Sequence, residues 1–129
     1  MTNIELKFVH ISENAFFSQE GKLNIIGIFD RIFVVNFPAM QPAFAISIGL
    51  IGKKNFYNIK IEIVSPQNQV IASLGGNIEI KEDGGGANFV ANVIGLPFAS
   101  EGRYLIRIKS GEHLLSESNY LILEKANNV

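Results

Sequence analysis

The sequence contains no cysteine, and this absence excludes disulfide bonds and thiolate metal ligands. A chain without cysteine fits a reducing compartment, and the expected location is cytoplasmic, with a peripheral or a virion-associated location as the alternatives. The first residues lack the basic start and apolar stretch of a signal peptide. No apolar run approaches about 18 residues, the length that a transmembrane helix needs, so we expect no membrane anchor.

Charge is also scarce, because charged residues make up 18% of the chain and hydrophobic residues 47%. The 11 basic and 12 acidic residues nearly balance, and no basic run exceeds Lys53-Lys54. Binding to nucleic acid or to an anionic membrane usually needs a basic excess, so neither is an expected partner. A small domain with so little charge has apolar surface left for another chain. We therefore expect a protein partner or self-association as a homo-oligomer.

The motifs of catalysis and metal binding are missing as well. His10 and His113 are the two histidines, and neither belongs to a His-x-His or His-Glu-x-x-His pattern. No Gly-x-Ser-x-Gly is present, and Gly84-Gly85-Gly86 lies between two strand-like segments, unlike a phosphate-binding loop before a helix. We predict no catalytic residue, no cofactor and no metal site. Whether His10 and His113 meet other polar groups in space stays open.

The pattern that is present has a period of two residues. Phe44, Ile46, Ile48 and Leu50 alternate with smaller or polar residues, and the same alternation recurs in 57–63 and 104–108. Successive side chains of a strand point to opposite faces, so each series predicts one buried side. The segments read as strands are 4–10, 22–35, 43–51, 56–65, 69–74, 77–82, 87–95, 102–109 and 113–123.

Many short strands between turn residues, without any helical segment of ten residues, predict an all-β fold. We expect one domain over residues 1–129, an immunoglobulin-like, two-sheet antiparallel β-sandwich of about eight to nine strands. Segment 23–35 is apolar on both faces. It is expected to be a central strand that is covered on both sides, or a strand that kinks at Gly27 from one sheet to the other.

The run Gly21-Lys22-Leu23-Asn24-Ile25-Ile26-Gly27-Ile28-Phe29-Asp30-Arg31-Ile32, followed by Phe37-Pro38-Ala39, carries a resemblance. It is similar to an early "GKLNIIGIFD…FP" signature in a family of small, uncharacterised prokaryotic β-sandwich domains. The resemblance implies a sandwich fold of about this length. It implies no activity, cofactor or site residue, because the family has no assigned function.

Five residues are singled out as structural or interaction candidates. Asp30 and Arg31 are two charged residues inside an apolar stretch. They form either a polar anchor for a ligand or partner, or the end of a strand where Asp30 accepts hydrogen bonds from backbone amides. Phe16 and Phe17 are expected to be one core and one interface aromatic, or both to lie under a loop. Tyr104 follows Gly102 as a tyrosine corner would near the start of a late strand.

The sequence therefore does not determine a function. The favoured hypothesis is a non-enzymatic protein-interaction or structural module. The alternatives are a small-ligand-binding sandwich and, least favoured, an enzyme whose site is assembled from distant strands.

Overall fold

The computed structural model describes residues 3–126, apart from the side chains of Gln41 and Pro42. These residues form nine strands and no helix. The strands are β1 (Ile4–Phe17), β2 (Leu23–Ile28), β3 (Arg31–Val34), β4 (Ala39–Gly52), β5 (Asn55–Val64), β6 (Val70–Ile80), β7 (Gly85–Phe98), β8 (Gly102–Ser110) and β9 (His113–Lys125).

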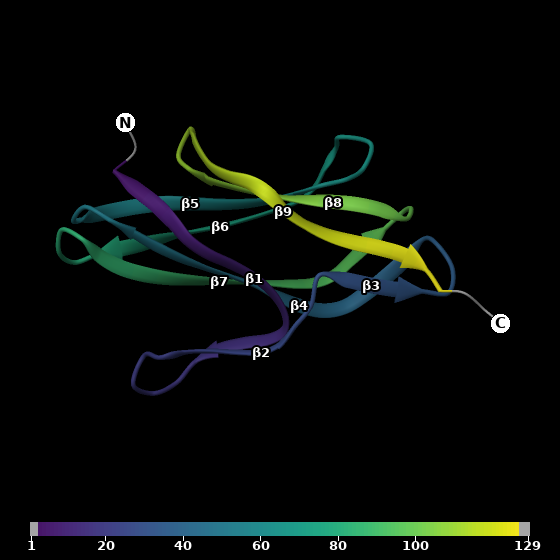
Figure 1. The fold of residues 1–129 in the computed structure, drawn as a ribbon, viewed down its shortest axis with the longest axis horizontal. Helices are drawn as coiled ribbons and strands as arrows, with labels where there is room; N and C mark the ends of the chain where they lie inside the picture. The colour runs from purple at the N-terminus through teal and green to yellow at the C-terminus, as the bar shows by residue number, and fades with distance from the viewer. Residues whose placement is uncertain (1–2, 127–129) are drawn as a thin grey trace.

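The nine strands build two sheets that face each other (Figure 1). The four-stranded sheet has the order β2-β1-β4-β7, and the five-stranded sheet has the order β3-β9-β8-β5-β6. All neighbouring strands are antiparallel except β3 and β9, which run parallel from Arg31↔Ile122 to Val34↔Lys125. The predicted all-β, two-sheet sandwich is confirmed, with one parallel pair added at its edge.

The core consists of the alternating apolar faces of both sheets. Ile46 and Ile48 of β4 face Ile59, Ile61 and Ile63 of β5 across the interior, and all five are fully buried. β-branched side chains suit this environment because they pack well on a pleated surface. The period-two pattern therefore identified the buried side of these strands correctly.

Tyr104 closes the end of the core where β7 passes to β8. Its hydroxyl donates a hydrogen bond to the carbonyl of Ser100 at 2.7 Å, and its ring meets Phe98 edge-on at 4.9 Å between centroids. A buried tyrosine near the start of a late strand, bonded to backbone a few residues upstream, is the tyrosine corner of immunoglobulin-like sandwiches.

We expect Tyr104→Phe to lower the free energy of unfolding by about 1 kcal/mol, because the Ser100 carbonyl loses its donor. Urea denaturation measures this change. Tyr120→Phe is the matched control, since the Tyr120 ring is 40% exposed and its hydroxyl has no hydrogen-bond partner among the described residues. Equal losses in the two variants would contradict the role of the Tyr104 hydroxyl.

A small ion network covers the outer side of the five-stranded sheet. Glu62 Oε1 lies 3.3 Å from Arg107 Nη1 and 3.4 Å from Lys109 Nζ, and Arg107 Nε lies 3.7 Å from Glu117 Oε2. Burial alone would raise the pKa of Glu62, but hydrogen bonds from Arg107 and Lys109 and their positive charges hold the pKa below its ordinary value. Glu62 therefore stabilises the fold in its ionised form.

A carboxyl group whose pKa is lower in the folded chain stabilises above its ordinary pKa of about 4.3, and this contribution is lost as the pH falls through the lowered value. We expect Glu62→Gln to be less stable than the wild type at pH 7, by about 1 kcal/mol. The difference should shrink towards pH 3 as the wild-type carboxylate is protonated. Urea denaturation at both pH values checks this, and a difference that grows in acid would contradict it.

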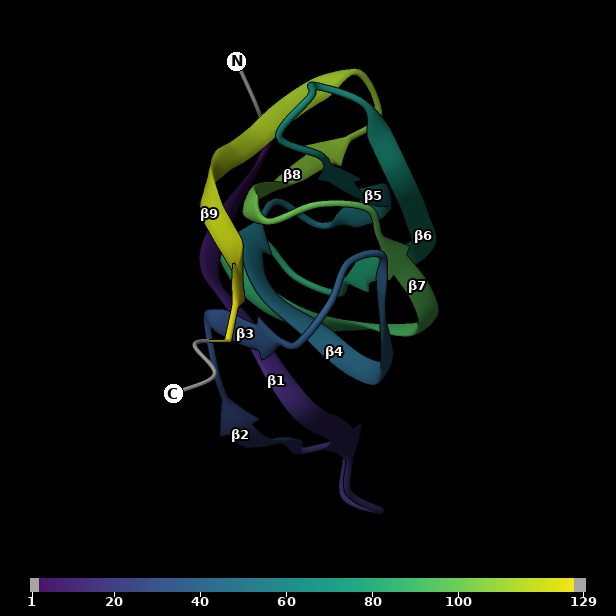
Figure 2. The same ribbon diagram turned by 90° about the vertical axis from the view of Figure 1, so that its right-hand side faces the viewer.

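The β1–β2 hairpin belongs to the four-stranded sheet but folds over the outer side of the β4 and β7 part of this sheet (Figure 2). β1 pairs with β4 up to Ser12↔Ala45 and continues with β2 as its partner from Ser12↔Ile28 to Phe17↔Leu23. In Figures 1 and 2 this hairpin lies on the outer side of β4 and β7. Ala45 and Ser47 point to that side, yet both are fully buried.

Segment 22–35 is where the strand prediction differs most from the structure. It divides at Phe29 and Asp30 into β2 of the four-stranded sheet and β3 of the five-stranded sheet, so the predicted change of sheet occurs. The expectation of a central strand is wrong, because both β2 and β3 are edge strands. The break is needed because the chain has to cross from one sheet to the other. Segments 69–74 and 77–82 instead form one strand, β6, which runs through Gly75 and Gly76.

Candidate functional site

The outward face of the β1–β2 hairpin gathers large apolar side chains in solvent. Paired residues of an antiparallel ladder share a face, so the register places one set of side chains on the side away from the sandwich. This set, the hairpin face, consists of Asn14, Phe16, Asn24, Ile26 and Ile28. Phe16 is 44% exposed, Ile26 53% and Ile28 60%. The hairpin face carries no charged residue.

β3 extends this apolar surface. Phe33 is 63% exposed and lines one depression together with Ile28. Glu13 and Arg31 line the same depression and give it a charged border. An apolar centre with a polar rim is the usual composition of a protein-binding surface.

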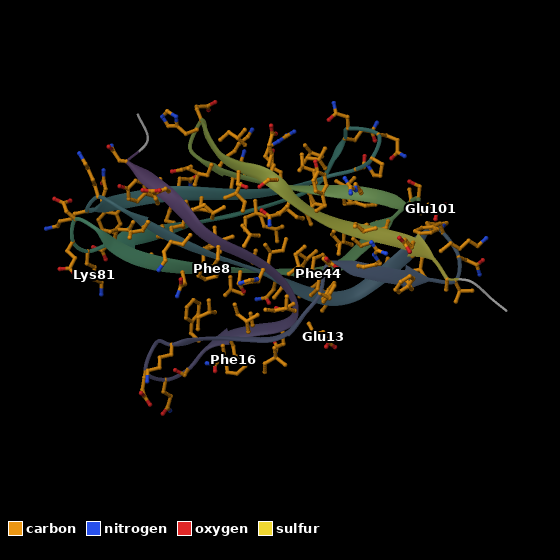
Figure 3. All side chains as sticks on the ribbon, viewed as in Figure 1. Phe8, Glu13, Phe16, Phe44, Lys81 and Glu101 are labelled. Carbon is orange, nitrogen blue, oxygen red and sulfur yellow. The ribbon has the colours of Figure 1, made fainter. Side chains whose placement is uncertain are left out.

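The opposite side of the hairpin faces the sandwich. Ala15 is buried there and is paired with the half-buried Ile25. Phe17 lies on this side too, yet 47% of it is exposed, because it is next to the tip of the hairpin. Neither Phe16 nor Phe17 belongs to the core, so the expectation of one core aromatic is wrong. Figure 3 shows Phe16 on the hairpin and Phe8 between the hairpin and the sandwich.

Gly27 shapes the end of the hairpin. It has a φ of 72°, and a Cβ at this position would collide with the side chain of Glu13. Glycine is the residue that adopts such a conformation without steric cost. The ladder with β1 therefore skips Gly27 and ends at the pair Ser12↔Ile28, after which the chain turns towards Phe29.

Asp30 and Arg31 are both exposed and lie at the crossing between the sheets. The guanidinium of Arg31 pairs with Glu124 of β9 at 3.0 Å. The main-chain carbonyl of Asp30 accepts a hydrogen bond from the amide of Ile122 at 2.8 Å. Within residues 3–126, the Asp30 carboxylate accepts no backbone amide, so the capping role considered for it is absent there. A role for the pair in binding stays a prediction.

We expect Asp30→Ala to change the free energy of unfolding by less than about 0.5 kcal/mol, because the alanine keeps the main-chain bond to Ile122. Thermal and urea denaturation of the two proteins check this. A loss above about 1.5 kcal/mol would show that the carboxylate has a structural partner.

His10 shares a depression of about 340 Å³ with Asp30, Asn119 and Tyr120, where β1 and β9 approach each other. The ring of His10 stacks on Phe8, with 5.4 Å between centroids. His113 is exposed beside the β8–β9 turn and does not line this depression. In the described part of the chain, no three His, Cys, Asp or Glu side chains are grouped as metal ligands would be.

A second hollow, of about 450 Å³, lies between the hairpin and the part of the four-stranded sheet that the hairpin covers. Its lining consists of Phe8, His10, Gly21, Lys22, Leu23, Ile25 and Asn88. The fully buried hydroxyl of Ser47, which opposes His10 on β4, has no hydrogen-bond partner among the described residues. Ligand pockets are mostly apolar with a few polar groups, and this lining has that composition. The small-ligand alternative stays a prediction, with this hollow as its location.

Sequence reasoning missed Ile26, Ile28 and Phe33 as surface residues. The segment carries no charge between Leu23 and Phe29, and this signal is the same for a buried strand and for an apolar edge strand. Strand pairing distinguishes the two cases, because β2 pairs with β1 on one side and is the terminal strand of its sheet.

Comparison with known proteins gives a family and a fold. Residues 7–122 match the model of a family of unknown function, DUF6941, in agreement with the resemblance of the sequence to an uncharacterised family. None of the curated proteins matches the chain significantly. No helix in the described residues is long and apolar enough to cross a membrane.

Among solved structures, the C-terminal domain of wzt is similar over 100% of this chain and 77% of its own, with a TM-score of 0.59 and 13% identity. An immunoglobulin-like protein from Pseudomonas aeruginosa is 13% identical over 95% of this chain and 98% of its own, with a TM-score of 0.41. At this identity, the similarity to the wzt domain shows a shared fold and nothing about activity.

Proposed function

We propose that this chain, which belongs to the DUF6941 family of unknown function, is a non-enzymatic interaction module that self-associates through its β1–β2 hairpin. The observation that carries the proposal is the hairpin face, where Phe16, Ile26 and Ile28 are exposed to solvent and the charges of Glu13 and Arg31 lie only at the border, beside Ile28. Apolar surface gathered on one projecting element is a common mark of a protein-binding site.

A second copy of the chain is the partner that this surface fits. An isologous interface, the commonest kind between identical subunits, brings the same patch of each subunit together, so a patch of one charge sign would repel itself. The hairpin face is neutral, and its asparagines Asn14 and Asn24 offer both hydrogen-bond donors and acceptors. Self-association would also cover apolar surface that a charge-poor chain otherwise leaves in water. We propose the cytoplasm as the place of this association, because a chain without cysteine has no disulfide that would require an oxidising compartment.

We expect sedimentation velocity and light scattering to give a mass above the 14.2 kDa of one chain. Ile26→Asp should weaken the association at least about tenfold, because a carboxylate would then have to be desolvated at the centre of the interface.

Ile94→Asp is the matched control. Ile94 is also an isoleucine in an edge strand of the four-stranded sheet, and it is 77% exposed on β7. This variant should associate as the wild type does. A monomeric wild type, or equal weakening by both substitutions, would overturn the proposal. Circular dichroism and thermal unfolding show whether each variant is folded.

A further inference from the structure

We infer that the hollow between the β1–β2 hairpin and the outer side of the four-stranded sheet binds a small organic acid, with its carboxylate at Lys22 and its hydrocarbon body between Phe8 and Ile25. The hollow lies under the hairpin, on the side opposite to the hairpin face, so this site is independent of the proposed self-association. Its volume of about 450 Å³ is within the range of small-molecule sites.

Three neighbouring strands set the floor of the hollow. The ladders pair Phe8 with Gly49 and Gly49 with Asn88, so these residues form one row on the outer face of the sheet. A Cβ at Gly49 would collide with the ring of Phe8, so glycine is what allows this ring to lie close against β4. His10 stacks on Phe8 with 5.4 Å between the ring centroids. The floor therefore has aromatic rings on its β1 side and an amide on its β7 side.

The hairpin forms the roof and the opening. Leu23 and Ile25 lie on its side towards the sandwich and, together with Phe8, make up the apolar part of the lining. At the tip, the amide of Lys22 donates to the hydroxyl of Ser18 at 3.1 Å, and the carbonyl of Lys22 accepts a hydrogen bond from the amide of Ser18 at 2.8 Å. This turn fixes the backbone of Lys22, whose side chain lines the hollow and is 78% exposed. Its ammonium group therefore lies at the opening.

The polar part of the lining fits a ligand that accepts hydrogen bonds. Lys22, His10 and Asn88 can each donate one, and among the described residues no Asp or Glu lines the hollow. A carboxylate accepts such bonds, and they are stronger when the donor carries a positive charge. An organic acid joins this group to a hydrocarbon body, which the three apolar side chains of the lining would cover.

A buried hydroxyl beneath the lining also lacks a partner. Ser47 is fully buried and pairs with His10 across the β1–β4 ladder, so the two side chains share a face. Its Oγ makes no hydrogen bond with the described residues. Buried hydroxyls normally have a partner, and a polar group that enters the hollow can supply one, directly or through a water.

Glu20 competes with the acid for Lys22. Its carboxylate lies 3.5 Å from Lys22 Nζ, and the two side chains are 77% and 78% exposed. An ion pair in such an exposed place is weak, so another carboxylate can replace Glu20. Two substitutions of similar shape should therefore act in opposite directions. Lys22→Gln should weaken the binding of an acid, and Glu20→Gln should strengthen it.

Hexanoate is the probe for the experiment, and hexanamide is its uncharged counterpart of nearly the same shape. NMR titration of the ¹⁵N-labelled chain should give a Kd on the order of 1 mM for hexanoate, as expected for an acid of this size. The largest changes should occur at the amides of Phe8, Leu23 and Asn88, which line the hollow. Hexanamide should bind more weakly, because it lacks the charge.

The variants then test the recognition of the carboxylate. Lys22→Gln should raise the Kd of hexanoate about threefold, and Glu20→Gln should lower it about threefold. Lys54→Gln is the matched control, because Lys54 is also an exposed lysine in a turn and does not line the hollow. This variant should bind hexanoate as the wild type does. The Kd of hexanamide should be the same in all four proteins.

The absence of cysteine allows an independent test of the location. Asn88→Cys places one thiol in the lining, and Asn58→Cys places one on an exposed position of the five-stranded sheet. At a concentration well above its Kd, hexanoate should slow the reaction of N-ethylmaleimide with the first thiol and leave the reaction with the second unchanged.

Four results would overturn the inference: no saturable binding of hexanoate, spectral changes away from the hollow, equal protection of both thiols, or a Kd that Lys22→Gln does not raise. Thermal unfolding shows whether each variant is folded. The mass of the wild type in solution tests the proposed self-association separately, so either conclusion can fail while the other holds.

Discussion

The burial of isoleucine side chains between two sheets is the interaction on which the rest of this structure depends. Ile46, Ile48, Ile59, Ile61 and Ile63 are completely removed from water, and each comes from a strand in which every second side chain points inward. Because alternation is strict, a shift of one residue in any of these strands would expose its whole apolar set. The packing therefore fixes the register of the central strands and with it the positions of the edge strands.

The charge-poor composition has a structural counterpart. In a two-sheet sandwich, the inner faces take up the apolar residues and the outer faces are normally polar. Here the outer side of the four-stranded sheet is partly covered by the β1–β2 hairpin, with the small residues Ala45 and Ser47 beneath it. The hairpin in turn presents Ile26 and Ile28 to solvent. The hairpin therefore covers part of the sheet but exposes apolar side chains of its own.

How far the sequence predicts the structure depends on the kind of strand. Phe44–Leu50 and Tyr57–Ile63 were placed correctly, because a strand with one buried face shows a clear alternation. Segment 22–35 lacks alternation, and a uniformly apolar run does not distinguish a strand between two layers from one at an edge. Pairing partners distant in sequence decide such details, and local residue patterns do not contain them.

The crossing at Phe29 and Asp30 also determines how a mechanical load would travel through the domain. The hairpin continues at one end into the β1–β4 ladder and at the other end into β3, which lies parallel to β9. A pull on the hairpin would load its two ends along different sheets. In the parallel β3–β9 pair, tension along the strands would shear several hydrogen bonds at once instead of opening them one by one. The hairpin is therefore tied to both layers of the sandwich, and a force applied to it would be shared between them.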